Sequence, residues 1–312
     1  MKIFKNENVS KIYKKSAIAI GNFDGVHMGH QKVFRETRKI AKKRKIKFGV
    51  LTFTPLPIMF FNKKIKNYRL ASEIQKFNFF KKNKVDFVIN LKFSRKFSKI
   101  KASNFIKRII YKKINPKLLA VSNNFRFGQN RTGDIGLLKK FSTTYNYDLL
   151  NIKPFKHKDK IISSTKIRNY LKKGNINLAN KLLSRTWFVE GKVTKGKRIG
   201  RKLGYRTCNI DIKNYILPKK GIYAVKTSIG NKKKIYEGIS YLGSRPTFNG
   251  KKIFLETNIF GIKKDLYKKK LRVYFLKFLR KDKKFNSSEE LIKQMNKDVI
   301  FAKKELKTKL IL

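Results

Sequence analysis

The chain has 312 residues, of which 80 are Lys or Arg and 18 are Asp or Glu, so its formal net charge at pH 7 is +62. This length predicts about two domains, and an apolar fraction of 41% is enough to build hydrophobic cores, which excludes a disordered chain. The single cysteine, Cys208, excludes an internal disulfide framework and a cysteine-based zinc site. No apolar run approaches the roughly 20 residues that span a bilayer, and the charged residues 1–16 lead into too short an apolar run for a signal peptide. We therefore expect a cytoplasmic protein with no membrane partner.

The positive charge has two possible origins. A basic face would bind nucleic acid by neutralising phosphates, but the basic residues are spread over the whole length of the chain. Lys, Asn, Ile, Phe and Tyr are abundant and share AT-rich codons, so a compositional origin is favoured. We expect non-specific polyanion binding and no dedicated nucleic acid partner. The alternative from another functional class is a basic nucleic-acid-binding protein built on a relic enzyme fold.

Short apolar segments alternate with helical patterns in the first half of the chain. The predicted strands are residues 17–20, 48–53, 87–91 and 118–121, and the predicted helices are residues 29–43, 72–82, 103–111 and 136–145. Pro55 and Pro57 end the second strand. This alternation predicts a parallel sheet with crossover helices, in which ligands bind beyond the carboxyl ends of the strands.

The pattern changes after about residue 185, where apolar and polar residues begin to alternate with a period of two. The predicted strands are residues 187–193, 221–227, 253–259 and 271–277, followed by a helix over 287–309 with Ser287 or Ser288 as its N-cap. Closely spaced strands of this kind indicate a small antiparallel barrel. The boundary falls between Leu183 and Trp187, which gives domains 1–184 and 185–312.

A glycine-rich segment, Gly21-Asn-Phe-Asp-Gly-Val-His-Met-Gly-His-Gln31, lies between a predicted strand and a predicted helix. Gly25 and Gly29 permit tight turns and a close approach of the ligand, and a helix N-terminus attracts phosphate. His27 and His30 can donate hydrogen bonds to phosphate oxygens during an in-line transfer. The alternative is two ordinary polar residues near a turn, but two of only three histidines lie here.

A second polar segment is Ile162-Ser-Ser-Thr-Lys-Ile-Arg168. Its hydroxyl groups can cap a helix and still bind phosphate, and Arg168 can hold phosphate oxygens with two hydrogen bonds. Taken alone, such a segment is most often only a helix cap.

Together these segments resemble the nucleotidylyltransferase superfamily and, more narrowly, the bacterial bifunctional riboflavin kinase/FMN adenylyltransferase (FAD synthetase) family. Residues 52–57, 124–134 and 176–185 resemble further family segments, although Ser122 stands where the family usually has glycine. The resemblance implies a Rossmann-like α/β nucleotidylyltransferase fold for the first domain. It also implies adenylyl transfer from ATP to FMN, with phosphate-binding and catalytic roles for Gly21, Asn22, Phe23, Asp24, His27, His30, Asn124 and Arg126, and binding of the departing pyrophosphate by Ser163, Ser164, Thr165 and Arg168.

The second half also carries a glycine- and lysine-rich stretch, residues 191–204, in which Gly196 and Gly200 can present backbone N–H groups to phosphate. This stretch, the following Tyr205-Arg-Thr-Cys-Asn209 and later segments resemble the riboflavin kinase module. The resemblance implies that an antiparallel barrel with a terminal helix phosphorylates riboflavin. Thr207 and Asn209 would bind Mg²⁺ and ATP phosphates, and Glu256 would deprotonate the riboflavin hydroxyl.

One departure from the kinase pattern concerns the residue before Thr207. The family motif has proline there, whereas this chain has Arg206, which loses the restraint on φ and adds a charge. The leading interpretation is an ATP- and Mg²⁺-dependent enzyme whose substrates and products are riboflavin, FMN and FAD. The runner-up is an FMN adenylyltransferase with a weakened kinase module, and for Glu256 the plainer interpretation is a solvent-facing strand position.

Overall fold

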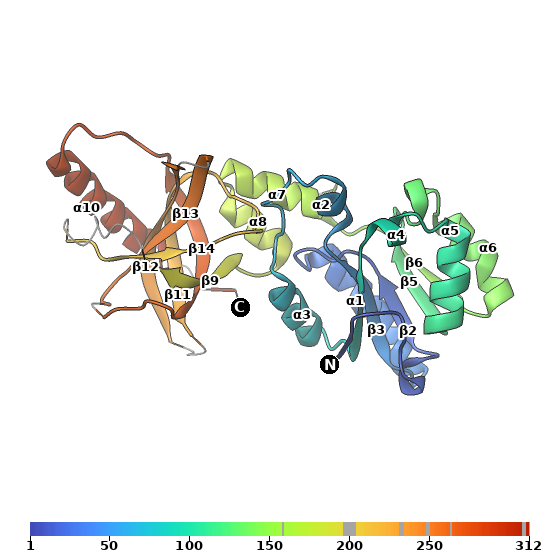
Figure 1. Ribbon diagram of the computed structural model, residues 1–312. Coiled ribbons are helices and arrows are strands. Elements are labelled where there is room, and N and C mark those ends of the chain that lie inside the picture. The colour runs from blue at the N-terminus through green and yellow to red at the C-terminus, as the bar shows by residue number, and fades with distance from the viewer. Residues whose placement is uncertain are drawn as a thin grey trace. The chain divides into compact units, whose positions relative to one another are not determined.

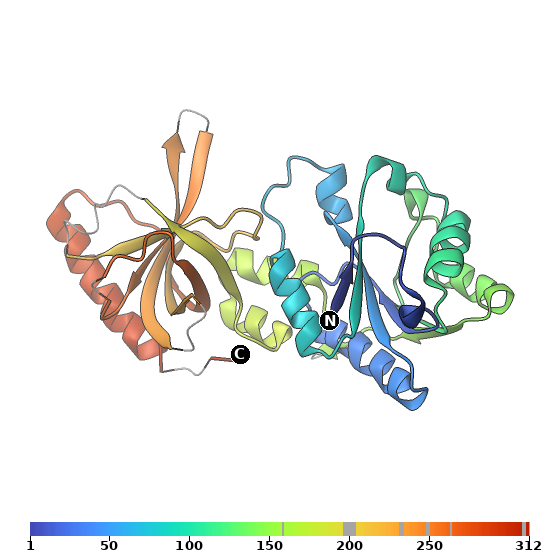
Figure 2. The ribbon, with the colours of Figure 1, turned by 60° about the horizontal axis from the view of Figure 1, so that its bottom comes forward.

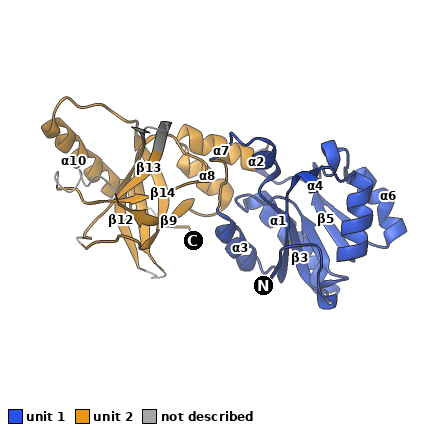
Figure 3. Ribbon diagram, viewed as in Figure 1, with its two compact units in different colours: residues 1–66, 72–163 blue, residues 67–71, 164–312 orange. Residues whose placement is uncertain are grey.

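The computed structural model describes residues 1–157, 159–195, 204–230, 234–247, 250–262, 264–307 and 310–311. The chain forms two compact units, residues 1–66 with 72–163 and residues 67–71 with 164–312 (Figure 3). Within the described ranges, every helix lacks the length or the apolar character needed to cross a membrane.

The first unit is built on a parallel sheet of six strands in the order β1–β4–β3–β2–β5–β6 (Figure 1). The strands are β1 Lys2–Phe4, β2 Ala17–Ile20, β3 Phe48–Thr54, β4 Phe87–Lys92, β5 Leu118–Ser122 and β6 Asp148–Ile152. The predicted Rossmann-like parallel sheet is therefore confirmed. The edge strands β1 and β6 were not predicted, because most of their side chains are partly or fully exposed and give no continuous apolar run.

Helices cover both faces of this sheet. They are α1 Met28–Lys43, α2 Pro57–Phe61, α3 Glu73–Lys82, α4 Arg95–Ser98, α5 Ala102–Asn104, the π-helical segment η2 Phe105–Ile114, and α6 Ile135–Tyr145; the short 3₁₀ turns η1 Lys11–Tyr13 and η3 Gln129–Arg131 and the two-stranded β7 Lys156–His157 and β8 Lys160–Ile161 complete the unit. The predicted helix over residues 103–111 thus corresponds to the end of α5 and most of η2.

The alternation of side chains along β3 shows how the two faces are divided. Leu51 packs in the same buried cluster as Ile106 of η2. Phe48, on the opposite face, has its ring centre 6.1 Å from that of Phe34 in α1, which in turn lies 5.5 Å from the ring centre of Phe80 in α3. One face of the sheet is therefore covered by η2 and the other by α1 and α3.

The second unit contains an antiparallel barrel (Figure 2). The barrel is closed, and its strand order is β10–β13–β12–β11–β14–β9. Its strands are β9 Phe188–Thr194, β10 Thr207–Ile210, β11 Gly221–Ile229, β12 Ile235–Thr247, β13 Gly250–Ile259 and β14 Lys270–Arg280, and the terminal helix is α10 Ser288–Glu305. The predicted barrel and its terminal helix are confirmed, with Ser287 as the N-cap. Strand β10 was not predicted because its sequence, Thr-Cys-Asn-Ile, is mostly polar and gives no apolar run. Strand β12 was not predicted because Gly238 and Gly243 interrupt its alternation.

Helices α7 Ser164–Lys173 and α8 Ile176–Leu183 belong with the barrel, so the compact units divide earlier than the predicted residue 184/185 boundary. The Asn180 side chain donates a hydrogen bond to the Phe275 carbonyl at 3.0 Å. The Trp187 indole donates to the carbonyl of Leu70 at 2.8 Å. This last contact explains why residues 67–71, far away in sequence, are part of the second unit.

An ion pair between the half-buried Arg280 and the buried Asp298 attaches α10 to the barrel. Arg280 Nε and Nη2 donate to the two carboxylate oxygens of Asp298 at 2.8 and 2.6 Å, and Gln294 donates to the same carboxylate at 2.9 Å. Asp298 is only 6% exposed, so these donors take the place of water around its carboxylate.

We predict that Asp298→Ala lowers the free energy of unfolding by about 3 kcal/mol, because it leaves the Arg280 guanidinium without its buried counterion. Chemical denaturation followed by circular dichroism measures this change. Glu289→Ala, in the exposed first turn of the same helix, is the control and is expected to cost less than about 1 kcal/mol. Equal stability of the Asp298→Ala variant and the native chain would contradict the anchoring role.

Candidate functional site

The first candidate site lies at the topological switch point of the parallel sheet, between the neighbouring strands β2 and β5. Strand β2 pairs with β3 on one side and with β5 on the other, both in parallel. The connections after β2 and β5 therefore leave the same edge of the sheet but lead toward opposite faces, which is where open α/β sheets bind ligands. This edge carries two sets of predicted residues, Gly21 to His30 after β2 and Asn124 with Arg126 after β5.

The backbone between β2 and α1 is held in a strained conformation. Phe23, Gly25 and Val26 have φ values of 49°, 78° and 41°, in the left-handed region that residues other than glycine rarely adopt. Such a conformation persists only where surrounding contacts enforce it. Phe23 and Val26 are both buried, and the Phe23 ring packs edge-on against His30 with the ring centres 5.2 Å apart.

The two histidines of this segment are stacked at the start of α1. Their ring centres lie 3.6 Å apart with an interplanar angle of 21°. His27 is the N-cap residue, yet its side chain makes no capping hydrogen bond, so the imidazole does not compete with a ligand for the first N–H groups of the helix. A methyl group on Gly29 would come within 3.1 Å of the His27 ring, which explains why glycine occupies the position before His30.

The connection after β5 presents Asn124 and Arg126, both exposed. The Ser122 hydroxyl donates to Asn124 Oδ1 at 3.0 Å, so this chain uses serine in place of the family's glycine to orient the amide. Arg126 pairs with Asp134 at 2.8 Å. The backbone N–H of Leu137 and the Arg126 guanidinium hold the pKa of Asp134 below its usual range.

The serine-rich segment spans the division between the units. Ser163 is the last residue of the first unit, whereas Ser164 and Thr165 begin α7 in the second. Arg168 follows one turn later and is 6% exposed. Its Nε donates to the Tyr68 carbonyl at 2.9 Å, and its guanidinium carbon lies 3.7 Å from the Tyr68 ring centre. Sequence reasoning missed Tyr68, since no motif marks the residue that holds an arginine from a hundred positions away.

The second candidate site lies on the outer face of the barrel. Thr207 and Asn209 are two residues apart on β10 and therefore point to the same side. Glu256 of β13 is directly opposite Asn209, and Tyr241 of β12 is opposite Glu256 on its other side. The fold thus brings together all three predicted kinase residues. Predicted residues Gly196 and Gly200 lie outside the described residues.

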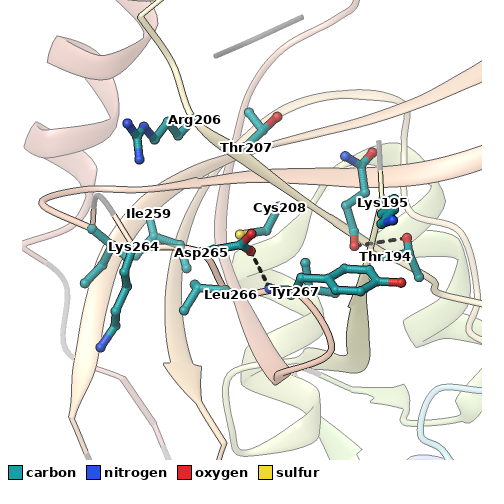
Figure 4. Close-up of a pocket in the computed structure, with 13 residues that line it drawn as sticks. Thr194, Lys195, Arg206, Thr207, Cys208, Ile259, Lys264, Asp265, Leu266 and Tyr267 are labelled. Atoms are coloured by element: carbon teal, nitrogen blue, oxygen red, sulfur yellow. Dashed lines mark hydrogen bonds between the residues drawn. The ribbon is translucent and has the colours of Figure 1, made fainter. Parts of the chain in front are cut away.

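Thr207 and Asn209 are among the residues that line a hollow beside β10. Figure 4 shows this hollow with ten of its lining residues labelled. Side chains that sequence reasoning did not assign to the site complete its lining, among them Lys264, Asp265 and Tyr267. The described residues contain no cluster of three or more His, Cys, Asp or Glu side chains that would hold a metal. The oxygen atoms of Thr207 and Asn209 nevertheless suit Mg²⁺, which takes most of its other ligands from phosphates and water.

The position that departs from the family pattern is held by a side chain from β13. Asn258 Nδ2 donates to the carbonyl of Arg206 at 2.7 Å. Proline would restrain this backbone through its ring, whereas here a hydrogen bond restrains it immediately before Thr207. The Arg206 side chain is exposed at the pocket.

Cys208 lies between the two predicted metal-binding residues on β10 and also lines the pocket, but its side chain points to the opposite side of the strand from theirs. Burial raises the pKa of its thiol to about 11, and the negative charge of Asp265 adds to this effect. The thiol is therefore protonated at neutral pH and is a weak nucleophile.

Comparison with known proteins decides the family. A sequence model of the FAD synthetase family matches residues 9–166, and one of the riboflavin kinase family matches residues 183–306. The bifunctional riboflavin kinase/FMN adenylyltransferase of Buchnera aphidicola subsp. Schizaphis graminum is 40% identical over 308 residues, which cover 97% of this chain and 98% of that protein. This chain belongs to the bifunctional riboflavin kinase/FMN adenylyltransferase family. The family predicted from the sequence is thus confirmed.

Other members of the family extend over the same length. The protein of the same name from Escherichia coli strain K12 is 33% identical over 97% of each chain, and that from Bacillus subtilis is 30% identical over 91% of this chain and 90% of its own. A crystal structure described as a macrolide-efflux protein from Streptococcus pneumoniae has a TM-score of 0.85 at 27% identity and covers 96% of this chain and 98% of its own. The two chains share one fold over nearly their whole length, while the printed name concerns that protein alone.

We predict that Cys208 reacts with iodoacetamide at pH 8 about tenfold or more slowly than glutathione, because little thiolate is present below a pKa of about 11. The rate should rise with pH until the solution approaches that value. Mass spectrometry of the intact chain measures the adduct, and Cys208→Ala gives the background because Cys208 is the single cysteine. If Cys208 reacted at pH 8 as fast as glutathione, the raised pKa of its thiol would be contradicted.

Proposed function

We propose that this chain phosphorylates riboflavin to FMN on the barrel and adenylylates FMN to FAD at the edge of the parallel sheet, using ATP and Mg²⁺ in both reactions. One observation carries the proposal: models of the two families match successive parts of the chain, residues 9–166 and residues 183–306. The chemistry of each site fits its module, with stacked imidazoles at a helix N-terminus in the first and a carboxylate beside hydroxyl and amide oxygens in the second.

In adenylyl transfer, an oxygen of the FMN phosphate attacks the α-phosphorus of ATP. The bond from that phosphorus to the bridging oxygen breaks, and pyrophosphate leaves. The attacking phosphate is already an anion at neutral pH, so the site has to position and stabilise charge rather than remove a proton. His27, His30 and the first N–H groups of α1 donate to the α-phosphate oxygens as their charge grows.

The remaining predicted residues of the first site bind the phosphates of the substrates and the pyrophosphate product. The Gly21–Asp24 backbone holds ATP phosphates, and Asn124 with Arg126 holds phosphate of ATP or FMN. Ser163, Ser164, Thr165 and Arg168 bind the departing pyrophosphate through hydroxyl groups and a guanidinium. The carbonyl and the ring of Tyr68 both contact the Arg168 guanidinium and so fix its orientation.

In the kinase reaction, the nucleophile is an alcohol and must lose its proton. Glu256 accepts the proton of the riboflavin 5′-hydroxyl while the hydroxyl oxygen attacks the γ-phosphorus of ATP and ADP leaves. Thr207 and Asn209 would hold Mg²⁺ and the ATP phosphates, and the ion would neutralise phosphate charge when bound. Register places Asn209 directly opposite Glu256, so the base and the nucleotide-binding residues share one face.

Two properties of the whole chain accompany this proposal. We place the protein in the cytoplasm, where ATP and riboflavin are available. A net charge of +62 should also give it salt-sensitive, sequence-independent affinity for polyanions.

Separate loss of the two activities tests the assignment. His27→Ala and His30→Ala should each lower FAD formation from FMN by roughly 10²-fold, the cost of one preorganised donor, and leave FMN formation intact. Glu256→Gln should abolish nearly all FMN formation and leave FAD formation from added FMN unchanged. Chromatographic separation of riboflavin, FMN and FAD measures all three. Both histidine variants making FAD at the native rate would exclude the first site, and a native chain that never phosphorylates riboflavin at any Mg²⁺ concentration would favour the weakened-kinase alternative.

The hydrogen bond from Asn258 predicts how the kinase tolerates Arg206. Asn258→Ala should raise the Mg²⁺ and ATP concentrations needed for FMN formation, since the backbone before Thr207 is no longer restrained. Arg206→Pro should leave FMN formation equal or higher and should rescue the Asn258→Ala variant, because the ring replaces the lost restraint. Steady-state kinetics against Mg²⁺ for the single and double variants measures this coupling. Failure of Arg206→Pro to rescue, or a sharp loss of kinase in Arg206→Pro alone, would show that Arg206 acts through its own side chain.

A further inference from the structure

Lys76 is the only lysine that is buried among the residues whose side chains the structure describes, and it is 5% exposed. It lies on the core-facing stripe of α3, together with Gln75, Phe79 and Phe80. A position of this kind normally carries an apolar side chain. Burying an ammonium group costs free energy unless polar partners offset the lost hydration, so packing alone does not explain the choice of lysine here.

The Lys76 ammonium begins a chain of hydrogen bonds that ends on the loop between β2 and α1. Lys76 Nζ donates to Thr52 Oγ1 at 3.2 Å, and Thr52 Oγ1 donates to the carbonyl of Asn22 at 3.2 Å. An ammonium group has donors and no acceptor, so the Thr52 hydroxyl must accept from Lys76. Its own hydrogen is thereby directed to Asn22, and the direction of both bonds is fixed.

The fold explains why these three residues meet. Thr52 lies near the carboxyl end of β3 on the face that α1 and α3 cover, because it alternates with Leu51. A capping box formed by Ser72 and Gln75 begins α3 and sets the position of its first turn. Lys76 follows immediately, so its side chain reaches the end of the strand.

The bond to Asn22 acts on the peptide that precedes the strained residue Phe23. In a trans peptide the carbonyl and the following N–H point in opposite directions. Holding the Asn22 carbonyl against Thr52 therefore turns the Phe23 N–H away from the Thr52 hydroxyl. It also helps to enforce the left-handed φ of 49° at Phe23.

We propose that Lys76 is a positioning residue for adenylyl transfer, which acts through Thr52 to fix the Asn22–Phe23 peptide so that its N–H faces the phosphates of ATP. This inference rests on the proposed role of the Gly21–Asp24 backbone in phosphate binding. Lys76 itself touches neither substrate nor reacting atoms, and its effect on the rate passes through the loop.

Two isosteric or near-isosteric variants of the full-length chain test the proposal. Thr52→Val keeps the side-chain shape and removes the hydroxyl, and Lys76→Met keeps the length and removes the ammonium. Each should lower kcat for FAD formation about tenfold or more, as misplacement of a positioning group does, with KM for FMN changed less than about twofold. Thr52→Ser retains the hydroxyl and should restore the native rate. Lys82→Met, at an exposed position on the same helix, is the matched control and should leave both activities unchanged.

Coupling between the two variants distinguishes a positioning role from a purely structural one. If one chain of hydrogen bonds is responsible, the Thr52→Val/Lys76→Met double variant should be no slower than the slower single variant. FMN formation from riboflavin by the same samples should be unchanged, and thermal unfolding should show a folded first unit. Single variants that make FAD within about twofold of the native rate, or losses that multiply in the double variant, would overturn the proposal.

The His27→Ala variant separates failure of this inference from failure of the proposed function. If His27→Ala also leaves FAD formation intact, the phosphate site itself is wrongly assigned. If His27→Ala is impaired while the Lys76 and Thr52 variants are not, only the role of Lys76 is wrong.

Discussion

The left-handed turn between β2 and α1 is the constraint on which the site that we propose for adenylyl transfer depends. It allows α1 to begin directly beyond the carboxyl end of a central strand, with His27 at its N-cap. The backbone would relax if it were not held at several points. Two of these points are the buried Phe23 ring, which packs against His30 and Phe34 of α1, and the carbonyl of Asn22, which accepts a hydrogen bond from Thr52. The strain is therefore supported by the same packing that stabilises the first unit.

The sequence predicted those parts of the fold and site that depend on local pattern. Buried strands such as β2 are continuous apolar runs, and the histidine pair stands out because histidine is so rare in this chain. Edge strand β6 is half-exposed and gave no such signal. Tyr68, Asn258 and Lys76 escaped notice for a different reason. Each contacts a residue distant in sequence, and only the folded chain shows which of many similar tyrosines, asparagines and lysines makes that contact.

The two sites differ in the way that their nucleophiles require. A phosphate nucleophile is already charged, and in our proposal the imidazoles, backbone N–H groups and basic side chains of the first site balance that charge. An alcohol nucleophile needs a base, and in a chain with only 18 acidic residues Glu256 stands directly opposite Asn209. The strongly basic composition is compatible with both sites, because each handles ATP and because carboxylates can still have specific partners, as Asp298 has in Arg280.

Residues 67–71 have a consequence for any attempt to separate the halves of the enzyme. This short stretch comes from the middle of the first half of the sequence but packs with the second unit, where Tyr68 orients Arg168 and Leu70 accepts the hydrogen bond of the buried Trp187 indole. No single cut in the chain keeps both units whole. A barrel expressed from residue 164 onward would carry a buried indole N–H that has lost this acceptor, and a fragment ending at residue 163 would carry residues 67–71 without the elements against which they pack. The two units therefore depend on each other for more than the link at residue 163, because one segment of the second unit lies inside the sequence of the first.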